Sequence, residues 1–263
     1  MDNISALFFD IDGTLVSFKT HQIPRSTVEA IAKAKENGVE IYISTGSPLQ
    51  IITNLKDIEP YIDGYITTNG ALCFVGSNVV CCNPIPKKNV DFLLSDADRY
   101  DYAVLVVGES GVGLYNKKPV FDEVFVRGLN VTNIDTTLSV VDMLEKEEVL
   151  QFTPFISAAH EKALMENLPG CVSGRWHPAF TDITAKAADK GKGLEAMASY
   201  LNIAISQTMA FGDGGNDIAI LKRAGIGVAM GNAGDGAKAA ADYITTSVDE
   251  DGVWNALKHF GVI

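Results

Sequence analysis

Two aspartates, Asp10 and Asp12, directly follow the apolar run Ala6–Phe9 near the start of the chain. A run without polar residues is typical of a strand buried on both faces of a parallel sheet. Ligands of open α/β sheets bind beyond the carboxyl ends of the strands, so both carboxylates are expected where chemistry is usually done. Two acids this close repel each other unless a cation or a shared proton intervenes, and such oxygen ligands suit Mg²⁺. A plain polar turn is the alternative interpretation of this stretch taken alone.

Two further apolar strands are predicted to end in polar turns that contain glycine. Val39–Ile43 leads into Thr45 and Gly46, and Thr208–Phe211 leads into residues 212–217. If the sheet is parallel, all three turns lie at one edge. The Thr45 side chain and the backbone N–H groups around Gly46 are then available to bind a phosphate group.

The third of these turns adds acids, and a lysine elsewhere adds a positive charge. Asp213 and Asp217 can complete a metal site with Asp10 and Asp12. Lys190, at a predicted helix start, offers a compact charge for a phosphate oxygen. Each feature alone is also explained as a turn, a helix cap or a solvated lysine. Their coincidence favours a site for a metal ion and a phosphate group.

The order of the predicted elements divides the chain into two parts. Residues 1–82 and 183–263 alternate strands with helices, which predicts an α/β fold with a doubly wound, mostly parallel, Rossmann-like sheet. Residues 83–182 have a compact α+β pattern of domain size, which we interpret as an inserted cap domain. An insertion over the crevice can exclude water and recognise the leaving group.

Residues near the end of the insertion are candidates for substrate contact. They are Arg175, Trp176, His177 and Asp182. Each also has a plain structural explanation, because a tryptophan can pack in a core, a histidine can be satisfied internally and a charge can be solvated. We expect this part of the cap to influence substrate choice.

The composition excludes several classes of partner. The net charge of -12 would repel nucleic acid and anionic membranes, so neither is expected as a partner. The 4 cysteines lack the spacing of a zinc site and are interpreted as thiols in a reducing compartment. We find neither a signal segment nor an apolar run approaching the roughly 20 residues of a membrane span, which favours a cytoplasmic location. A monomer or a weak homo-oligomer is expected.

Four motifs in this order resemble those of the haloacid dehalogenase superfamily. They are Asp10-Ile11-Asp12-Gly13-Thr14, Thr45 before Gly46, Lys190 before Gly191, and Gly212-Asp213-Gly214-Gly215-Asn216-Asp217. The resemblance covers the whole chain and is greatest to Cof-type sugar-phosphate phosphatases, which carry a large α/β cap between the second and third motifs. Many relatives have an arginine after the Thr-Gly pair, where this chain has Ser47 and Pro48. This departure affects the expected substrate choice and leaves the expected chemistry unchanged.

The resemblance implies a role for each matching residue. Asp10 would be the nucleophile, and Asp12 would be the acid for the leaving alcohol and then the base for water. Mg²⁺ would be held by the Asp10 side chain, the Asp12 backbone carbonyl and Asp213. Asp217 would support the metal ligands and orient Lys190. The residues that would bind or lie beside the phosphoryl group are Thr45, Gly46, Lys190 and Asn216.

Together these features predict a Mg²⁺-dependent phosphatase. Its substrates would be small phosphorylated metabolites, above all hexose phosphates, and the reaction would pass through an aspartyl phosphate. A phosphomutase that uses the same aspartate is an alternative, because the motifs do not distinguish water from a second hydroxyl as acceptor. A non-catalytic phospho-acceptor or phosphosugar-binding module is another. Asp12 argues against that second alternative, because an acid/base at this position hastens turnover of an aspartyl phosphate.

Overall fold

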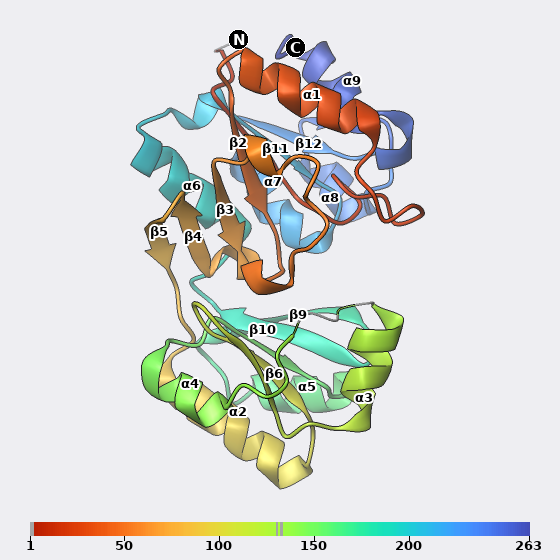
Figure 1. The fold of residues 1–263 in the computed structure, drawn as a ribbon. Coiled ribbons are helices and arrows are strands. Elements are labelled where there is room, and N and C mark those ends of the chain that lie inside the picture. The colour runs from red at the N-terminus through yellow and green to blue at the C-terminus, as the bar shows by residue number, and fades with distance from the viewer. Residues whose placement is uncertain (1–2, 130, 132–133) are drawn as a thin grey trace. The chain divides into compact units, whose positions relative to one another are not determined.

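The computed structural model describes residues 3–129, 131 and 134–263, and the chain divides into two compact units (Figure 1). The first unit consists of Met1–Ser47, Ile52–Cys82 and Asp189–Ile263, and the second of Pro48–Ile51 and Asn83–Ala188. The N-terminal and C-terminal parts of the described chain therefore both belong to the first unit. Within the described ranges, none of the helices has the length and apolar character needed to cross a membrane.

An eight-stranded sheet forms the centre of the first unit, in the order β13-β12-β11-β1-β2-β3-β4-β5. Neighbouring strands from β13 to β3 pair in parallel, and β4 and β5 extend the sheet antiparallel. This arrangement confirms the predicted mostly parallel α/β fold. The strands are β1 (Ala6–Phe9), β2 (Glu40–Ser44), β3 (Gly64–Thr67), β4 (Leu72–Val75), β5 (Asn78–Cys82), β11 (Thr208–Gly212), β12 (Ile226–Ala229) and β13 (Tyr243–Ile244).

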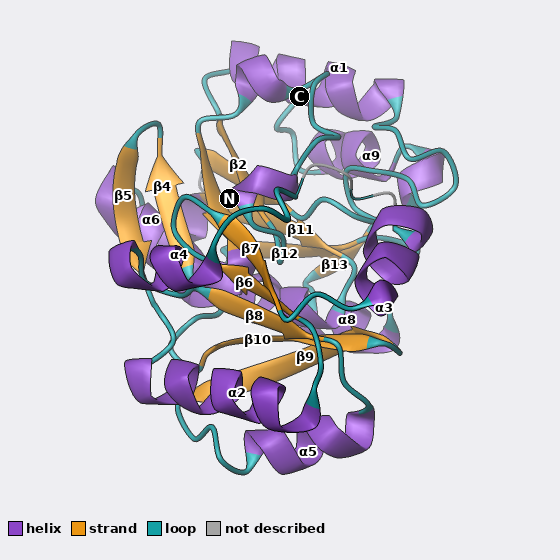
Figure 2. Ribbon diagram, turned by 60° about the horizontal axis from the view of Figure 1, so that its bottom comes forward, coloured by secondary structure: helices purple, strands orange, loops and turns teal. Residues whose placement is uncertain are grey.

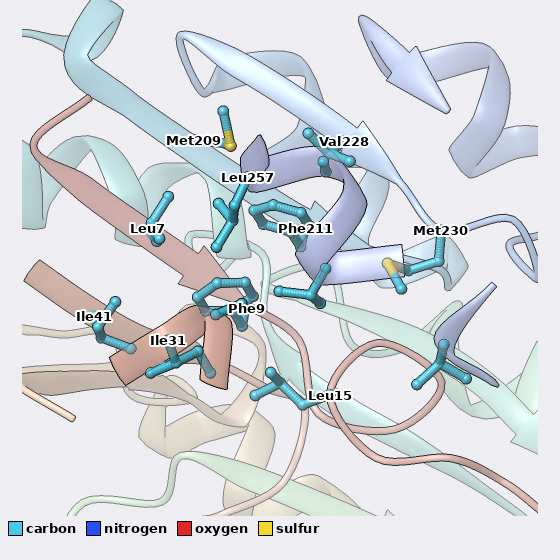
Figure 3. Close-up of a cluster of buried hydrophobic side chains, with 14 of the residues drawn as sticks. Leu7, Phe9, Leu15, Ile31, Ile41, Met209, Phe211, Val228, Met230 and Leu257 are labelled. Carbon is cyan, nitrogen blue, oxygen red and sulfur yellow. The ribbon is translucent and has the colours of Figure 1, made fainter. Parts of the chain in front are cut away.

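Helices pack on both faces of this sheet. Successive side chains of β1 point to opposite faces, and since all of them are apolar, both faces must be covered. Leu7 and Phe9 join the cluster that includes α1 and α9, where Phe9 stacks on Phe211 and Leu257 lies close by (Figure 3). Phe8 joins a second cluster with buried residues of α6 and α7. The helices of this unit are α1 (Arg25–Glu36), α6 (Lys190–Leu201), α7 (Ile218–Arg223), α8 (Asp235–Ala240) and α9 (Gly252–His259).

The register of the central strands brings three turns together. Phe9 is aligned with Ile43 of β2 and with Phe211 of β11. The residues that follow these three positions therefore leave the sheet at the same edge. The sheet thus positions the turns that carry the candidate site residues.

The second unit is built on a five-stranded antiparallel sheet in the order β7-β6-β8-β10-β9. Helices α2 and α5 cover one face of this sheet (Figure 2). A cluster rich in phenylalanine, with residues of α3 and the following π-helical turn, packs on its other face. The elements are α2 (Lys87–Tyr100), β6 (Val104–Val107), β7 (Val112–Tyr115), α3 (Pro119–Phe121), the π-helical turn (Asp122–Gly128), α4 (Val140–Lys146), β8 (Gln151–Pro154), α5 (Ala158–Met165), β9 (Cys171–His177) and β10 (Phe180–Ala185).

The boundary at the end of the insertion differs from the prediction. Residues 183–188 belong to the second unit, whereas the sequence pattern placed the return to the first unit at residue 183. The physical reason is that β10 continues to Ala185, where it pairs with β9, and its Ile183 and Ala185 are buried in the core of the second unit.

Candidate active site

Lys190 lies between two carboxylates that come from distant parts of the chain. Its Nζ atom is 2.6 Å from Oδ1 of Asp10 and 2.5 Å from Oδ1 of Asp217. Asp10 directly follows β1, Asp217 ends a short 3₁₀ turn after β11, and Lys190 is the first residue of α6. All three residues are buried, with only 1% of Lys190 exposed. The sheet edge and one helix start therefore bring these predicted site residues into direct contact.

The single positive charge of Lys190 does not balance the negative charges of the carboxylates around it. Burial alone would lower the pKa of Lys190, but the charges of Asp10 and Asp217 outweigh it, so its pKa is raised and the group is charged. Burial, and then the charge of Asp217, raises the pKa of Asp10 well above its usual range. The same two causes raise the pKa of Asp213 to about 6. A divalent cation would offset this excess negative charge.

Three carboxylates converge closely enough to hold a metal ion. Oxygens of Asp10, Asp213 and Asp217 all lie within 4.8 Å of one another. Asp217 already uses both oxygens, because Oδ1 accepts from the lysine ammonium group and Oδ2 accepts the N–H groups of Asp213 at 3.0 Å and Gly214 at 2.8 Å. Asp213 accepts a hydrogen bond from the Thr14 hydroxyl through Oδ1. Asp10 and Asp213 are therefore the carboxylates best placed to bind a hard divalent ion directly.

Asp12 differs from Asp10 because its side chain is exposed. Desolvation by surrounding atoms raises its pKa, although the nearby charge of Lys190 lowers it in part. The next residue, Gly13, has φ +84°, and a Cβ there would lie 2.3 Å from Oδ2 of Asp213. Glycine is thus required at this turn both for the backbone conformation and for the close approach. A carboxyl group with a raised pKa is suited to donate a proton.

The Thr45 turn lies against two asparagines. The Thr45 side chain is buried, and its hydroxyl accepts the N–H of Ser47 at 3.1 Å. A Cβ built on Gly46 would lie 3.0 Å from the carboxamide oxygen of Asn69 and 3.4 Å from Nδ2 of Asn216. The structure therefore places Asn216 beside this turn, as it places Asp217 beside Lys190.

Sequence reasoning missed the residues that fix the start of α6. Asp189 is the N-cap residue, and its Oδ1 accepts the backbone N–H of Lys192 at 2.8 Å. The same oxygen accepts from Nη1 of Arg223 at 2.7 Å. An aspartate directly before a helix is a capping signal that the sequence shows, whereas nothing in the sequence indicates that Arg223 of α7 is its partner.

Asn232 is a second residue that sequence reasoning missed. Its Nδ2 donates to the carbonyl oxygen of Gly13 at 2.8 Å, and its Oδ1 accepts the N–H of Val248 at 2.9 Å. The first contact joins residues 219 positions apart in the chain, and the second joins residues 16 positions apart. The asparagine therefore ties the turn after β1 to the C-terminal part of the first unit.

Comparison with known families agrees with this geometry. The family model described as haloacid dehalogenase-like hydrolase matches residues 7–257. The chain belongs to the haloacid dehalogenase-like hydrolases. Within this family it is a Cof-type phosphatase, as its named relatives and its structural neighbours indicate.

Two solved structures and one relative of known sequence match nearly the whole length of this hydrolase. The subclass IIB sugar phosphatase BT4131 is 46% identical, with a TM-score of 0.89 over 98% of this chain and 100% of that chain. The phosphatase BT1666 from Bacteroides thetaiotaomicron is 35% identical, with a TM-score of 0.87 over 99% and 96%. The 5-amino-6-(5-phospho-D-ribitylamino)uracil phosphatase YcsE of Bacillus subtilis is 27% identical over 98% of this chain and 96% of the relative.

In the cap of this hydrolase, Arg175 makes several internal contacts. Its Nε is 2.6 Å from Glu161, and its other nitrogens donate to backbone carbonyl groups of Ile156, His177 and Pro178. The guanidinium group therefore joins β9 to α5 and to the neighbouring loop. These contacts already occupy much of its donor capacity.

The other three cap candidates form a small aromatic and acidic group. Trp176 is 62% exposed, and its indole N–H donates to Oδ2 of Asp182 at 2.8 Å. The ring of Trp176 meets Phe180 edge-on, while the ring of His177 stacks on Phe180. Oδ1 of Asp182 accepts from the Thr153 hydroxyl at 2.7 Å. The group presents an exposed aromatic ring beside a hydrogen-bonded carboxyl group.

The buried lysine generates a stability prediction. In metal-free buffer, Lys190→Met should lower the free energy of unfolding by about 3–5 kcal/mol, because Asp10 and Asp217 then lose their ammonium partner. Adding Asp217→Asn to this variant should restore part of the loss. Urea unfolding of the parent and both variants, followed by circular dichroism, measures these differences.

A matched control comes from the same helix. Lys192 pairs with Asp189 at 3.3 Å, and its side chain is 47% exposed, so Lys192→Met should cost less than about 1 kcal/mol. Equal stability of the parent and Lys190→Met would contradict the assigned role of the ammonium group.

Asp182 generates a prediction about pH. Burial raises its pKa from 3.8 to about 6, despite its hydrogen bonds to Thr153 and Trp176. The folded state therefore binds this proton more tightly than the unfolded chain does, so the stabilisation is complete below about pH 4 and is lost as the pH rises past about 6. Between pH 4 and pH 7, the parent should lose up to ~3 kcal/mol of stability relative to Asp182→Asn.

Urea unfolding at several pH values measures this difference. Asp142→Asn, at an exposed position of the same unit, serves as the control and should give no such trend. A constant stability difference between the parent and Asp182→Asn across this pH range would show that the carboxyl group titrates normally.

Proposed function

We propose that this phosphatase hydrolyses sugar phosphates, above all hexose phosphates, with Mg²⁺ and through an aspartyl phosphate on Asp10. The observation that carries the proposal is the buried contact of Asp10 with Lys190 at the edge where the turns converge. A carboxylate held at a strand end beside a fixed cation is suited to attack phosphorus. The same cation can stabilise charge on the phosphoryl oxygens.

The proposed reaction has two steps. In the first, an Asp10 oxygen attacks phosphorus, the bond from phosphorus to the alcohol oxygen breaks, and Asp12 gives its proton to that oxygen. In the second, Asp12 takes a proton from water, whose oxygen attacks phosphorus, so that phosphate leaves and the Asp10 carboxylate is regenerated. The exposed position and raised pKa of Asp12 suit a group that alternates between acid and base.

The donor set fits a hard divalent cation. Side-chain oxygens of Asp10 and Asp213, with the backbone carbonyl group of Asp12, would hold Mg²⁺. Asp217 would act outside these ligands, because its oxygens already bind Lys190 and two backbone N–H groups. When bound, the ion supplies positive charge that keeps the carboxylates ionised and offsets charge on the phosphoryl group.

The phosphoryl group would be bound by residues from two turns and one helix start. Lys190 contributes the charge, and the turn of Thr45 and Gly46 contributes a hydroxyl and backbone N–H groups. Asn216 lies beside that turn and would contact the same group. These groups lie on two turns and one helix start of a single compact unit, which favours precise positioning.

The cap would recognise the sugar through Trp176 and Asp182. An exposed indole can pack against the apolar face of a sugar ring, and a carboxyl group accepts from hydroxyl groups. Among the described residues, the buried Oε1 of Gln151 has no hydrogen-bond partner, and Nε2 of the same residue is 3.4 Å from the Thr153 hydroxyl. This row of polar side chains on β8 and β10 is suited to bind the hydroxyl groups of a polyol. The internal contacts of Arg175 and His177 make them weaker candidates.

Phosphate release tests the proposal. The parent should hydrolyse members of a panel of sugar phosphates only with Mg²⁺, and EDTA should abolish turnover. Asp10→Asn should lose at least about 10³-fold in kcat, because the nucleophile is removed. Asp12→Asn should lose about 10²–10⁴-fold, the usual contribution of general acid–base catalysis.

Asp57→Asn provides a matched control on the surface of the same unit and should retain parental activity. An Asp10→Asn variant as active as the parent would contradict the mechanism. Hydrolysis of nucleotides or aryl phosphates alone would contradict the proposed substrate class.

The role of the cap can be tested separately. Trp176→Ala should lower kcat/KM for the preferred sugar phosphate about twofold to tenfold, since an aromatic contact contributes about 0.5–1.5 kcal/mol. Hydrolysis of acetyl phosphate should change less, because its leaving group has no ring that could pack against the indole. Val172→Ala, at another exposed position of β9, is the control. Equal losses for both substrates would show that Trp176 does not recognise the sugar.

A further inference from the structure

A fourth turn at the same sheet edge remains without a role. It follows β3, which pairs in parallel with β2, and consists of Thr68, Asn69 and Gly70. Their φ angles are +48°, +55° and +90°. Glycine and asparagine adopt this left-handed region readily, whereas a β-branched threonine rarely does. Strained backbone of this kind persists only where surrounding contacts hold it, often at functional sites.

The backbone of this turn contacts segments that carry proposed site residues. The N–H of Asn69 donates to the carbonyl oxygen of Thr45 at 3.0 Å, and that of Thr68 donates to Ser47 at 3.3 Å. Gly70 packs so closely on Asp189 that a Cβ would lie 2.3 Å from its carbonyl oxygen. The turn therefore touches the phosphate-binding turn and the residue that precedes Lys190.

The Asn69 side chain adds a contact to a third segment. Its Oδ1 accepts from Nδ2 of Asn216 at 3.0 Å. The same carboxamide lies over Gly46, where a Cβ would be 3.0 Å from Oδ1 and 3.2 Å from Nδ2. One side chain thus bridges the turn after β2 and the turn after β11.

We infer that Asn69 is a positioning residue for phosphoryl binding, an inference that rests on the proposed function. By accepting from Nδ2 of Asn216, it fixes the orientation of that carboxamide beside the turn that donates backbone N–H groups. Phosphoryl transfer depends mainly on positioning, so losing this bridge weakens binding of the phosphoryl group. The left-handed φ of Asn69 explains why asparagine occupies the position, since it combines this backbone conformation with a hydrogen-bonding side chain.

The variant Asn69→Gly tests the role of the Asn69 side chain separately from that of its left-handed backbone conformation. Glycine keeps the left-handed conformation at no steric cost and removes only the carboxamide. Loss of one hydrogen bond should lower kcat/KM for p-nitrophenyl phosphate about fivefold to tenfold and weaken competitive inhibition by inorganic phosphate by a similar factor. Asn202→Gly is the matched control, because this exposed asparagine ends α6 with φ +56°. It should change neither constant more than about twofold.

A double-mutant cycle with Asn216→Ala distinguishes positioning from a general structural effect. If Asn69 acts through Asn216, adding Asn69→Gly to Asn216→Ala should cause less than about a twofold further loss. Parental activity of Asn69→Gly, or losses that multiply in the double variant, would overturn the inference. If the parent binds inorganic phosphate with Mg²⁺ but hydrolyses no ester, the proposed function fails. The same cycle measured on phosphate binding by calorimetry then still decides the role of Asn69.

Discussion

The site depends on one buried ammonium group that two carboxylates share. Lys190 is contributed by α6, Asp10 by the end of β1 and Asp217 by the turn after β11, and the three meet within hydrogen-bond distance. Removing one partner from a buried charged group is far more costly than breaking a pair at the surface. The contact therefore joins the N-terminal and C-terminal segments of the first unit. Asp189, which caps α6 and binds Arg223, holds the start of the lysine helix in place.

A parallel sheet explains why chemistry-bearing residues gather from such distant segments. Strands that run in one direction end at one edge, so each turn places its polar residues beside those of its neighbours. The turns after β1, β2, β3 and β11 all follow strands that pair in parallel. The insertion begins directly after β5, the edge strand of the sheet, and ends at Ala188, shortly before the helix that starts at Lys190. The cap can thus be large without interrupting the parallel core.

Much of this arrangement is readable from the sequence, because it follows from local patterns. The apolar runs and polar turns predict the α/β core, and the position of Lys190 at a helix start agrees with α6. Contacts between side chains far apart in the sequence cannot be predicted in this way, because no local pattern indicates that Asn69 contacts Asn216 or that Asp189 contacts Arg223. The first unit resumes at Asp189 and not at the predicted residue 183, because a strand pattern does not reveal which sheet the strand joins.

The central claim is that Asp10 accepts the phosphoryl group, and trapping that intermediate tests it most directly. A hexose phosphate that the parent hydrolyses is mixed with enzyme and Mg²⁺, the reaction is quenched in acid, and the protein is reduced with borohydride, which converts an aspartyl phosphate to homoserine. Peptide mass spectrometry should find homoserine at position 10, in greater amount in Asp12→Asn if its second step is slowed more than its first. Turnover without homoserine at Asp10, in the parent and in Asp12→Asn, would contradict the account and favour direct attack by water.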